Sequence, residues 1–145
     1  MIDFLRDNIK TKKGLVTTSQ GEAIGTHDGV ELFTIGQRHG IGVPGGRAPF
    51  YVAEKNLTTG TLIVAEGNAD SILYNNNAFY NNANWIMPVS FPLICEARIR
   101  YRSLRAPCHV YEDQIVFLEP QWAVTSGQSV VFYNQKRMLG GGVIV

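Results

Sequence analysis

The sequence predicts a mainly β protein, in which a small α+β domain is followed by a closed antiparallel β-barrel. The chain has 145 residues, of which 45% are hydrophobic and 17% charged, so it can bury a core and does not resemble a disordered chain. Residues 1–72 mix helical spacing with strand-like runs. Residues 93–145 contain short apolar runs separated by turn residues, with no helical periodicity between them, and this pattern is typical of small barrels.

The first domain is predicted to span residues 1–82. Apolar residues at helical spacing indicate a helix over residues 2–9, ended by lysines and a glycine. A second helix is favoured over residues 30–35, with Asp28 as its N-cap, although the β-branched residues there leave a strand possible. Strands are expected at residues 14–21 and 22–25, joined by a turn near Gly21, and at residues 50–55 and 61–65.

A glycine-rich loop is expected over residues 36–47. It contains a literal G-x-G-x-x-G match, but Pro44 lies inside the match and a strand is predicted after it, so the helix that a dinucleotide site needs is missing. The side chains of Arg38, His39 and Arg47 suit contact with a polyanion. An exposed basic loop without a ligand explains them equally well.

The second domain is predicted to span residues 83–145, after an asparagine-rich junction. Its expected strands are residues 93–102, 108–111, 114–118, 129–133, 137–139 and 142–145. Tight turns are expected at residues 112–113 and 134–135. Three consecutive glycines at residues 140–142 predict a bulge or a close strand crossing, with a phosphate-binding nest as the alternative.

Arg98, Arg100 and Arg102 alternate along the predicted strand at residues 93–102. On a regular strand they would project from one face about 6.6 Å apart, a spacing close to that of phosphates along a nucleic acid. Cys95 and Tyr101 lie an odd number of residues from these arginines, so they would face the other way. By themselves the residues favour an ordinary solvated face over an RNA-binding ladder.

No catalytic constellation appears in the sequence. The two cysteines, Cys95 and Cys108, are too few for a disulfide scaffold and lack metal-knuckle spacing, so reduced thiols are expected. Walker motifs, paired carboxylates and metal-ligand spacings are absent, and the net charge is only +1. Because neither a signal-peptide core nor a run of about 18 apolar residues is present, we expect a cytoplasmic protein that does not contact a membrane.

An ordered series of motifs then resembles one known family. The motifs are GTHDG at residues 25–29, FTIGQRHGIG at 33–42, RIRYR at 98–102 and GQSVVFY at 127–133. Together they resemble the C-terminal portion of the tRNA-specific 2-thiouridylases, and the resemblance covers nearly the whole chain. It implies a central domain followed by a barrel similar to the second domain of translation elongation factors.

The resemblance also implies an activity for a longer parent protein. That enzyme uses ATP, with Mg, to adenylate uridine 34 of glutamate, glutamine and lysine tRNAs, and it then inserts sulfur from a cysteine persulfide. The ATP pyrophosphatase domain and both catalytic cysteines of the family have no match here. The fragment is therefore expected to be inactive alone and to hold no cofactor.

For this chain, the resemblance implies tRNA contacts at Arg100, Tyr101 and Gln128, and it favours the arginine ladder with Arg98 and Arg102. Arg38 lies in the loop at residues 34–42, which the family turns toward the tRNA. Ser103 follows Arg102 where the family usually has glutamine.

The implied partners are these tRNAs, the catalytic domain of the same parent chain and a persulfide sulfur-relay protein. Two rival hypotheses are a protein-interaction module that braces the catalytic domain or docks the relay protein, and a barrel that stacks single-stranded RNA on Tyr101, Phe132 or Tyr133.

Overall fold

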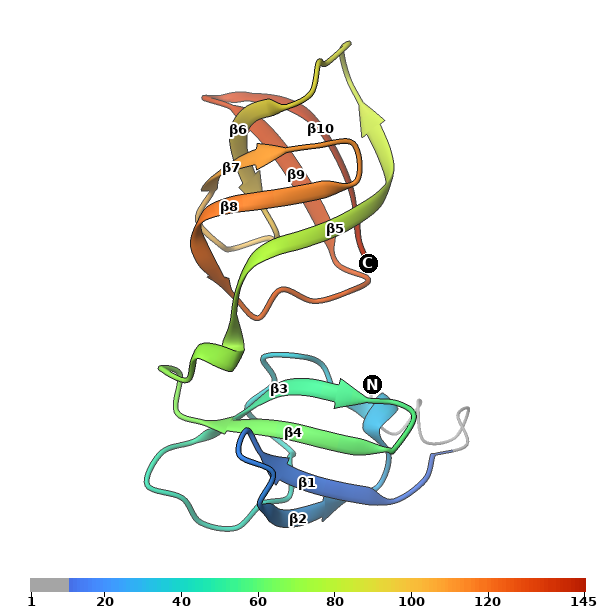
Figure 1. Cartoon of the computed structure of the whole chain (residues 1–145), viewed down its shortest axis with the longest axis vertical. Helices are drawn as coiled ribbons and strands as arrows, with labels where there is room; N and C mark the ends of the chain where they lie inside the picture. Colours follow the sequence, from blue (N-terminus) through green and yellow to red (C-terminus); the bar gives the residue numbers. More distant parts are fainter. Residues whose placement is uncertain (1–10) are drawn as a thin grey trace. The chain divides into compact units, whose positions relative to one another are not determined.

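The computed structural model describes residues 11–145 and divides into two compact units, Met1–Leu73 and Tyr74–Val145 (Figure 1). The helix expected at residues 2–9 lies outside the described residues. The division falls at Leu73, earlier than the boundary expected at residue 82. The reason is that the asparagine-rich segment belongs to a strand, β5 (Tyr74–Trp85), rather than to a junction.

Strand β5 shows how an asparagine-rich segment can still form a strand. Only Ala78 and Tyr80 of its central part point into the core, at alternating positions, while the asparagines stay exposed. Its backbone pairs with β8 on one side and β10 on the other. The register with β8 shifts between Asn75 and Asn77, and there Asn75 Oδ1 accepts the Asn77 amide at 2.9 Å and Asn76 Nδ2 donates to the Phe117 carbonyl oxygen at 3.4 Å. The asparagine side chains thus supplement the strand pairing at this irregularity.

The first unit contains a four-stranded sheet in the order β2-β1-β4-β3. Its strands are β1 (Gly14–Thr18), β2 (Ala23–His27), β3 (Phe50–Asn56) and β4 (Thr61–Glu66). The β1–β2 and β3–β4 pairs are antiparallel, whereas β1 runs parallel to β4. The predicted hairpin, its turn and both later strands are therefore confirmed. The core of this unit combines strand residues with residues of the segment between β2 and β3; its members are Val16, Val30, Leu32, Phe33, Ile41, Val52, Leu62 and Val64.

The helix favoured over residues 30–35 is reduced to a single 3-10 turn, η1 (Val30–Leu32). A second 3-10 turn, η2 (Ser71–Leu73), ends the unit. The N-cap of η1 is Gly29 and makes no side-chain cap hydrogen bond, so Asp28 is not the cap. Val30 and Leu32 of this turn are buried in the core of the unit. The β-branched residues Val30, Thr34 and Ile35 disfavour a longer helix here.

The second unit is a closed six-stranded barrel in the order β10-β5-β8-β7-β6-β9 (Figure 1). The remaining strands are β6 (Leu93–Arg98), β7 (Ala106–Val110), β8 (Gln114–Trp122), β9 (Ser129–Asn134) and β10 (Arg137–Ile144). Every pairing within the barrel is antiparallel, which confirms the predicted mainly β class and barrel. At its centre, Phe132 stacks on Trp85 at 5.1 Å between ring centroids and meets Tyr80 edge-on at 5.3 Å.

The triple glycine lies inside β10, where the barrel closes between β5 and β9. A Cβ atom on Gly140 would overlap the backbone carbonyl of Asn84, and one on Gly142 would lie 2.8 Å from the carbonyl oxygen of Asn81. The register shifts on both sides of this segment. The glycines therefore allow the close strand approach and bulges that the sequence predicted.

Alkaline pH is expected to destabilise the barrel through Tyr80. This side chain is only 2% exposed and donates a hydrogen bond to the Tyr111 carbonyl oxygen at 2.6 Å. Burial, followed by the charge of Asp113, raises the pKa of Tyr80 to about 12. The phenol in the unfolded chain ionises near pH 10, so the stabilisation is complete below pH 10 and is lost as the pH rises toward 12.

Over this range the wild type should lose about 2 to 3 kcal/mol more stability than Tyr80→Phe. Both tryptophans, Trp85 and Trp122, lie in the barrel, so denaturant unfolding followed by their fluorescence reports this unit. Equal pH dependence in the two proteins would contradict the account.

Candidate nucleic-acid interface

The loop between β6 and β7 carries Arg100 and Arg102, two of the arginines that the sequence analysis singled out. Strand β6 ends at Arg98, so the prediction that Arg98, Arg100 and Arg102 line one face of a single strand is wrong. The backbone turns after Arg100, whose carbonyl oxygen accepts hydrogen bonds from the Ser103 amide at 3.1 Å and the Ser103 hydroxyl at 2.9 Å. This turn ends strand pairing and sends the following side chains in different directions.

Arg100 is half-buried and holds the chain segment 122–128. Its Nη2 donates to the Ala123 carbonyl oxygen at 2.7 Å and to Thr125 Oγ1 at 3.4 Å, and its Nε donates to Gln128 Oε1 at 3.3 Å. The guanidinium also lies 4.8 Å from the centroid of a Trp122 ring. Burial lowers the pKa of Arg100. Most of its donors therefore point into the protein, and Arg100 acts as a brace.

The braced segment has an unusual backbone. Ala123 adopts φ 49°, a left-handed conformation that is uncommon without glycine, and Gly127 adopts φ 83°. Buried Thr125 donates from Oγ1 to the Ala123 carbonyl oxygen at 2.8 Å. The Gln128 amide group, at the end of this segment, lies against Arg100. The structure thus brings together Arg100 and Gln128, which the sequence analysis paired only through the resemblance.

Tyr101 and its neighbours form the exposed tip of the same loop. Tyr101 is 89% exposed and Leu104 is 90% exposed, and Arg102 is exposed beside them. The expectation that Tyr101 shares the inward face with Cys95 is wrong, because the turn rotates it out of the strand pattern. We call Tyr101, Arg102 and Leu104 the loop tip. An exposed aromatic ring next to an exposed guanidinium suits a stacked base and a nearby phosphate.

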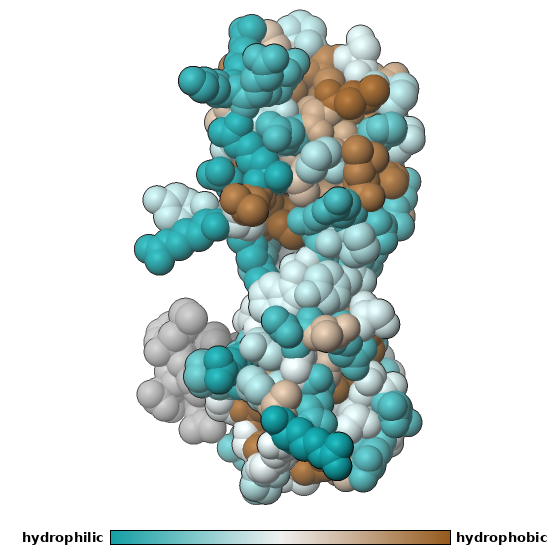
Figure 2. All heavy atoms as spheres, turned by 90° about the vertical axis from the view of Figure 1, so that its left-hand side faces the viewer, coloured by the Kyte–Doolittle hydropathy of each residue, from teal (hydrophilic) through white to brown (hydrophobic). Residues whose placement is uncertain are grey.

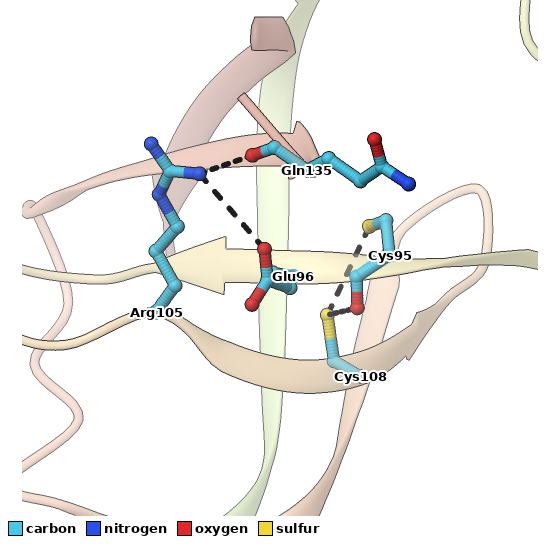
Figure 3. A network of polar contacts seen from close by, with 5 residues as sticks. All are labelled: Cys95, Glu96, Arg105, Cys108 and Gln135. Atoms are coloured by element: carbon cyan, nitrogen blue, oxygen red, sulfur yellow. Dashed lines mark hydrogen bonds and ion pairs between the residues drawn. The ribbon is translucent and has the colours of Figure 1, made fainter. Parts of the chain in front are cut away.

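Arg98 and Arg105 lie on Tyr133 of β9. Their guanidinium carbons are 5.7 and 3.8 Å from the centre of its ring. Arg105 also forms an ion pair with Glu96 at 3.9 Å and donates to the Gln135 carbonyl oxygen (Figure 3). This ring is therefore covered by arginines, and the ring of Phe132 is fully buried. Of the three aromatic residues in the stacking hypothesis, Tyr101 alone has a ring that is largely exposed.

In the first unit, the glycine-rich segment is a loop as predicted, and Arg38, His39 and Arg47 are exposed on it. They border an open hollow of about 540 Å³. Gln37 holds the start of the loop, because its Oε1 accepts the Thr34 amide at 3.1 Å and its Nε2 donates to the His39 carbonyl oxygen at 2.8 Å. The loop thus exposes basic side chains, and Gln37 holds the start of its backbone in place.

His27 has a structural role. It is 5% exposed, its Nδ1 accepts the Gly29 amide at 3.0 Å, and its Nε2 lies 3.0 Å from the Gly60 carbonyl oxygen. The ring bridges two loops and has no free position for catalysis. Over residues 11–145, His, Cys, Asp and Glu side chains form no group of three that could bind a metal ion. In the same part of the chain, no helix is long and apolar enough to span a membrane.

Comparison with known proteins matches both units separately. Residues 2–66 match the family model described as the tRNA methyl transferase PRC-barrel domain, and residues 75–144 match the aminomethyltransferase beta-barrel domain. The chain is 40% identical over 153 residues to the tRNA-specific 2-thiouridylase MnmA of Pasteurella multocida, covering 98% of this chain and 40% of that protein.

Other relatives give the same picture. The chain is 41% identical over 152 residues to the tRNA-specific 2-thiouridylase MnmA of Pseudomonas fluorescens, again covering 98% of this chain and 41% of the relative. It is 39% identical to the enzyme of the same name from Buchnera aphidicola, of which it covers 42%. The chain therefore spans about two-fifths of the length of these relatives. Its two domain matches and its similarity over nearly its whole length show that it belongs to the tRNA-specific 2-thiouridylase family.

Proposed function

We propose that this chain is the tRNA-binding and tRNA-orienting part of an enzyme that 2-thiolates uridine 34 in glutamate, glutamine and lysine tRNAs. The relatives are named as tRNA-specific 2-thiouridylases, and they are longer than this chain. The described residues contain no group of three His, Cys, Asp or Glu side chains that could hold a metal ion. In keeping with the resemblance, we assign ATP and Mg²⁺ to another part of the parent protein, and we expect this chain to be inactive by itself in the cytoplasm.

The observation that carries the proposal is the construction of the β6–β7 loop. Its base is held by Arg100, whereas Tyr101 and Arg102 at the loop tip are exposed. Tyr101 and Leu104 are both about nine-tenths exposed on this loop, and covering their apolar surface with a partner is favourable. A nucleic acid offers both a ring face for Tyr101 and a phosphate for Arg102.

Two further groups of residues complete the proposed contacts. Gln128, oriented by Arg100, presents a polar amide beside the loop, and Arg98 adds positive charge at the end of β6. In the first unit, Arg38 lies on the basic glycine loop. Several cationic contacts with phosphate would supply affinity that depends on salt and not on base sequence.

The experiment is fluorescence anisotropy of the chain with a labelled, unmodified glutamate tRNA transcript at about 50 and 200 mM salt. If cationic side chains neutralise several phosphates, affinity should fall by tenfold or more over this range. Absence of binding at both salt concentrations would refute the proposal that this part of the enzyme binds tRNA by itself.

A second candidate is a protein-docking role, either on the catalytic domain of the parent chain or on a persulfide-relay protein. It is favoured by exposed apolar side chains on the barrel, among them Phe79, Ile86, Ile94 and Leu118, each more than half exposed. Figure 2 shows hydrophobic residues in brown among hydrophilic ones in teal on the face turned to the viewer. Binding through such a surface would depend only weakly on salt, so the same titration against each protein partner separates the two roles.

A further inference from the structure

The barrel contains a pair of cysteines that its proposed tRNA-binding role does not use. Cys95 of β6 and Cys108 of β7 are directly opposite each other in the antiparallel register, and their sulfur atoms are 4.0 Å apart (Figure 3). The Cys108 sulfur also lies 3.6 Å from the Cys95 carbonyl oxygen. Both thiols are free in this structure.

The backbone geometry at this pair suits a disulfide. Directly opposite residues of an antiparallel pair have Cα atoms about 4.5 to 5.5 Å apart, inside the range of about 4.4 to 6.8 Å found across disulfides. The sulfur atoms need to approach to about 2.05 Å, which side-chain rotation can achieve without moving the strands far. The strands therefore hold the two thiols ready to join.

The two thiols differ in their access to solvent. Cys95 is 8% exposed and borders an open hollow of about 490 Å³ together with Glu96, Tyr133 and Gln135, whereas Cys108 is 1% exposed. Of the two cysteines, Cys95 lines this hollow and Cys108 does not. The hydrogen bond from the Cys108 thiol lowers the pKa of Cys95 and raises that of Cys108, to which burial adds. Cys95 is thus the better nucleophile of the two.

We propose that Cys95 and Cys108 form a reversible redox pair that a peroxide converts to a disulfide across β6 and β7. The Cys95 thiolate attacks one peroxide oxygen, the O–O bond breaks, and the product is a sulfenic acid plus water after protonation. The Cys108 sulfur then attacks the Cys95 sulfur, the S–O bond breaks, and the Cys108 proton leaves with the hydroxide as water. In total, two thiols and one hydrogen peroxide give one disulfide and two waters.

The position of the pair gives the disulfide a consequence. The residues between Cys95 and Cys108 include the whole β6–β7 loop, with Arg100 and the loop tip. A disulfide would close this segment covalently at the base of the hairpin. The cross-link constrains the unfolded chain, so the oxidised barrel should also unfold at a higher temperature.

The test uses the whole chain treated with hydrogen peroxide, followed by catalase and then by iodoacetamide in denaturant. We expect intact mass spectrometry to show the loss of two hydrogens and no alkylation, and dithiothreitol to restore two alkylatable thiols. Tryptic digestion should yield one peptide pair joined through Cys95 and Cys108. Thiols that stay alkylatable under conditions that oxidise glutathione, an intermolecular disulfide, or stable addition of oxygen in place of the cross-link would each overturn the proposal.

Two matched variants assign the roles of the sulfur atoms. In Cys108→Ser the sulfenic acid has no thiol to resolve it, so dimedone should label Cys95. In Cys95→Ser the remaining thiol is buried, and dimedone labelling should be far weaker. Equal labelling of the two variants would contradict the assignment of Cys95 as the attacking thiol. The wild-type mass measurement does not depend on either variant folding.

Discussion

Arg100→Ala is expected to lower the free energy of unfolding of the barrel by about 3 kcal/mol. The substitution removes charge-assisted hydrogen bonds to Ala123 and Gln128 and the contact with Trp122. Ala123 is buried and has a left-handed backbone, and the substitution removes the arginine donor from its carbonyl oxygen. The tryptophan-fluorescence unfolding midpoint of this small unit should fall by more than about 10 °C.

The matched control is Arg102→Ala, two residues along the same loop. Arg102 is exposed, so its removal should change stability by less than about 0.5 kcal/mol. If Arg100 were a solvated phosphate contact, the two variants would be equally stable. Arg100→Lys keeps the charge but loses the planar fork, so it should restore only part of the stability.

Tyr101→Ala is expected to weaken tRNA binding by roughly 5- to 150-fold, the cost of losing one aromatic stacking partner of about 1 to 3 kcal/mol. Because the side chain is 89% exposed, the unfolding midpoint should stay within experimental error of the wild type. Anisotropy with the glutamate tRNA transcript measures the affinity, and tryptophan fluorescence measures the stability of the same preparation.

Two controls sharpen this experiment. Tyr101→Phe retains the ring and should bind nearly as well as the wild type. Tyr111→Ala removes another exposed tyrosine, 40% exposed in the turn after β7, and should leave tRNA affinity unchanged. An equal loss of affinity in Tyr111→Ala and Tyr101→Ala would show that the loop tip has no special role.

The parts of the fold that the sequence predicted correctly have strong local signals. The hairpin of β1 and β2 and the short strands of the barrel are marked by short apolar runs separated by turn residues. Strand β5 was missed because asparagines dominate its exposed face and hide the two inward positions, Ala78 and Tyr80. Its place between β8 and β10 is set by long-range pairing, which composition does not reveal.

The candidate site shows the same limit. The spacing of Arg98, Arg100 and Arg102 predicted one strand face, but a local turn and the brace to Gln128 separate their roles. Ser103 was a signal of this turn, because serine is one of the residues that are common in turns. The contact between Arg100 and Gln128, 28 residues apart, depends on how β6 pairs with β9 in the barrel.

The central claim is that the loop tip contacts the phosphate backbone of tRNA, and its most direct test is the salt dependence of binding for the wild type and Arg102→Ala. Anisotropy titrations at several salt concentrations give the slope of log affinity against log salt. We predict a steep wild-type slope and a slope smaller in magnitude by about one for Arg102→Ala, as the loss of one phosphate contact requires. Identical slopes for the two proteins would contradict the claim.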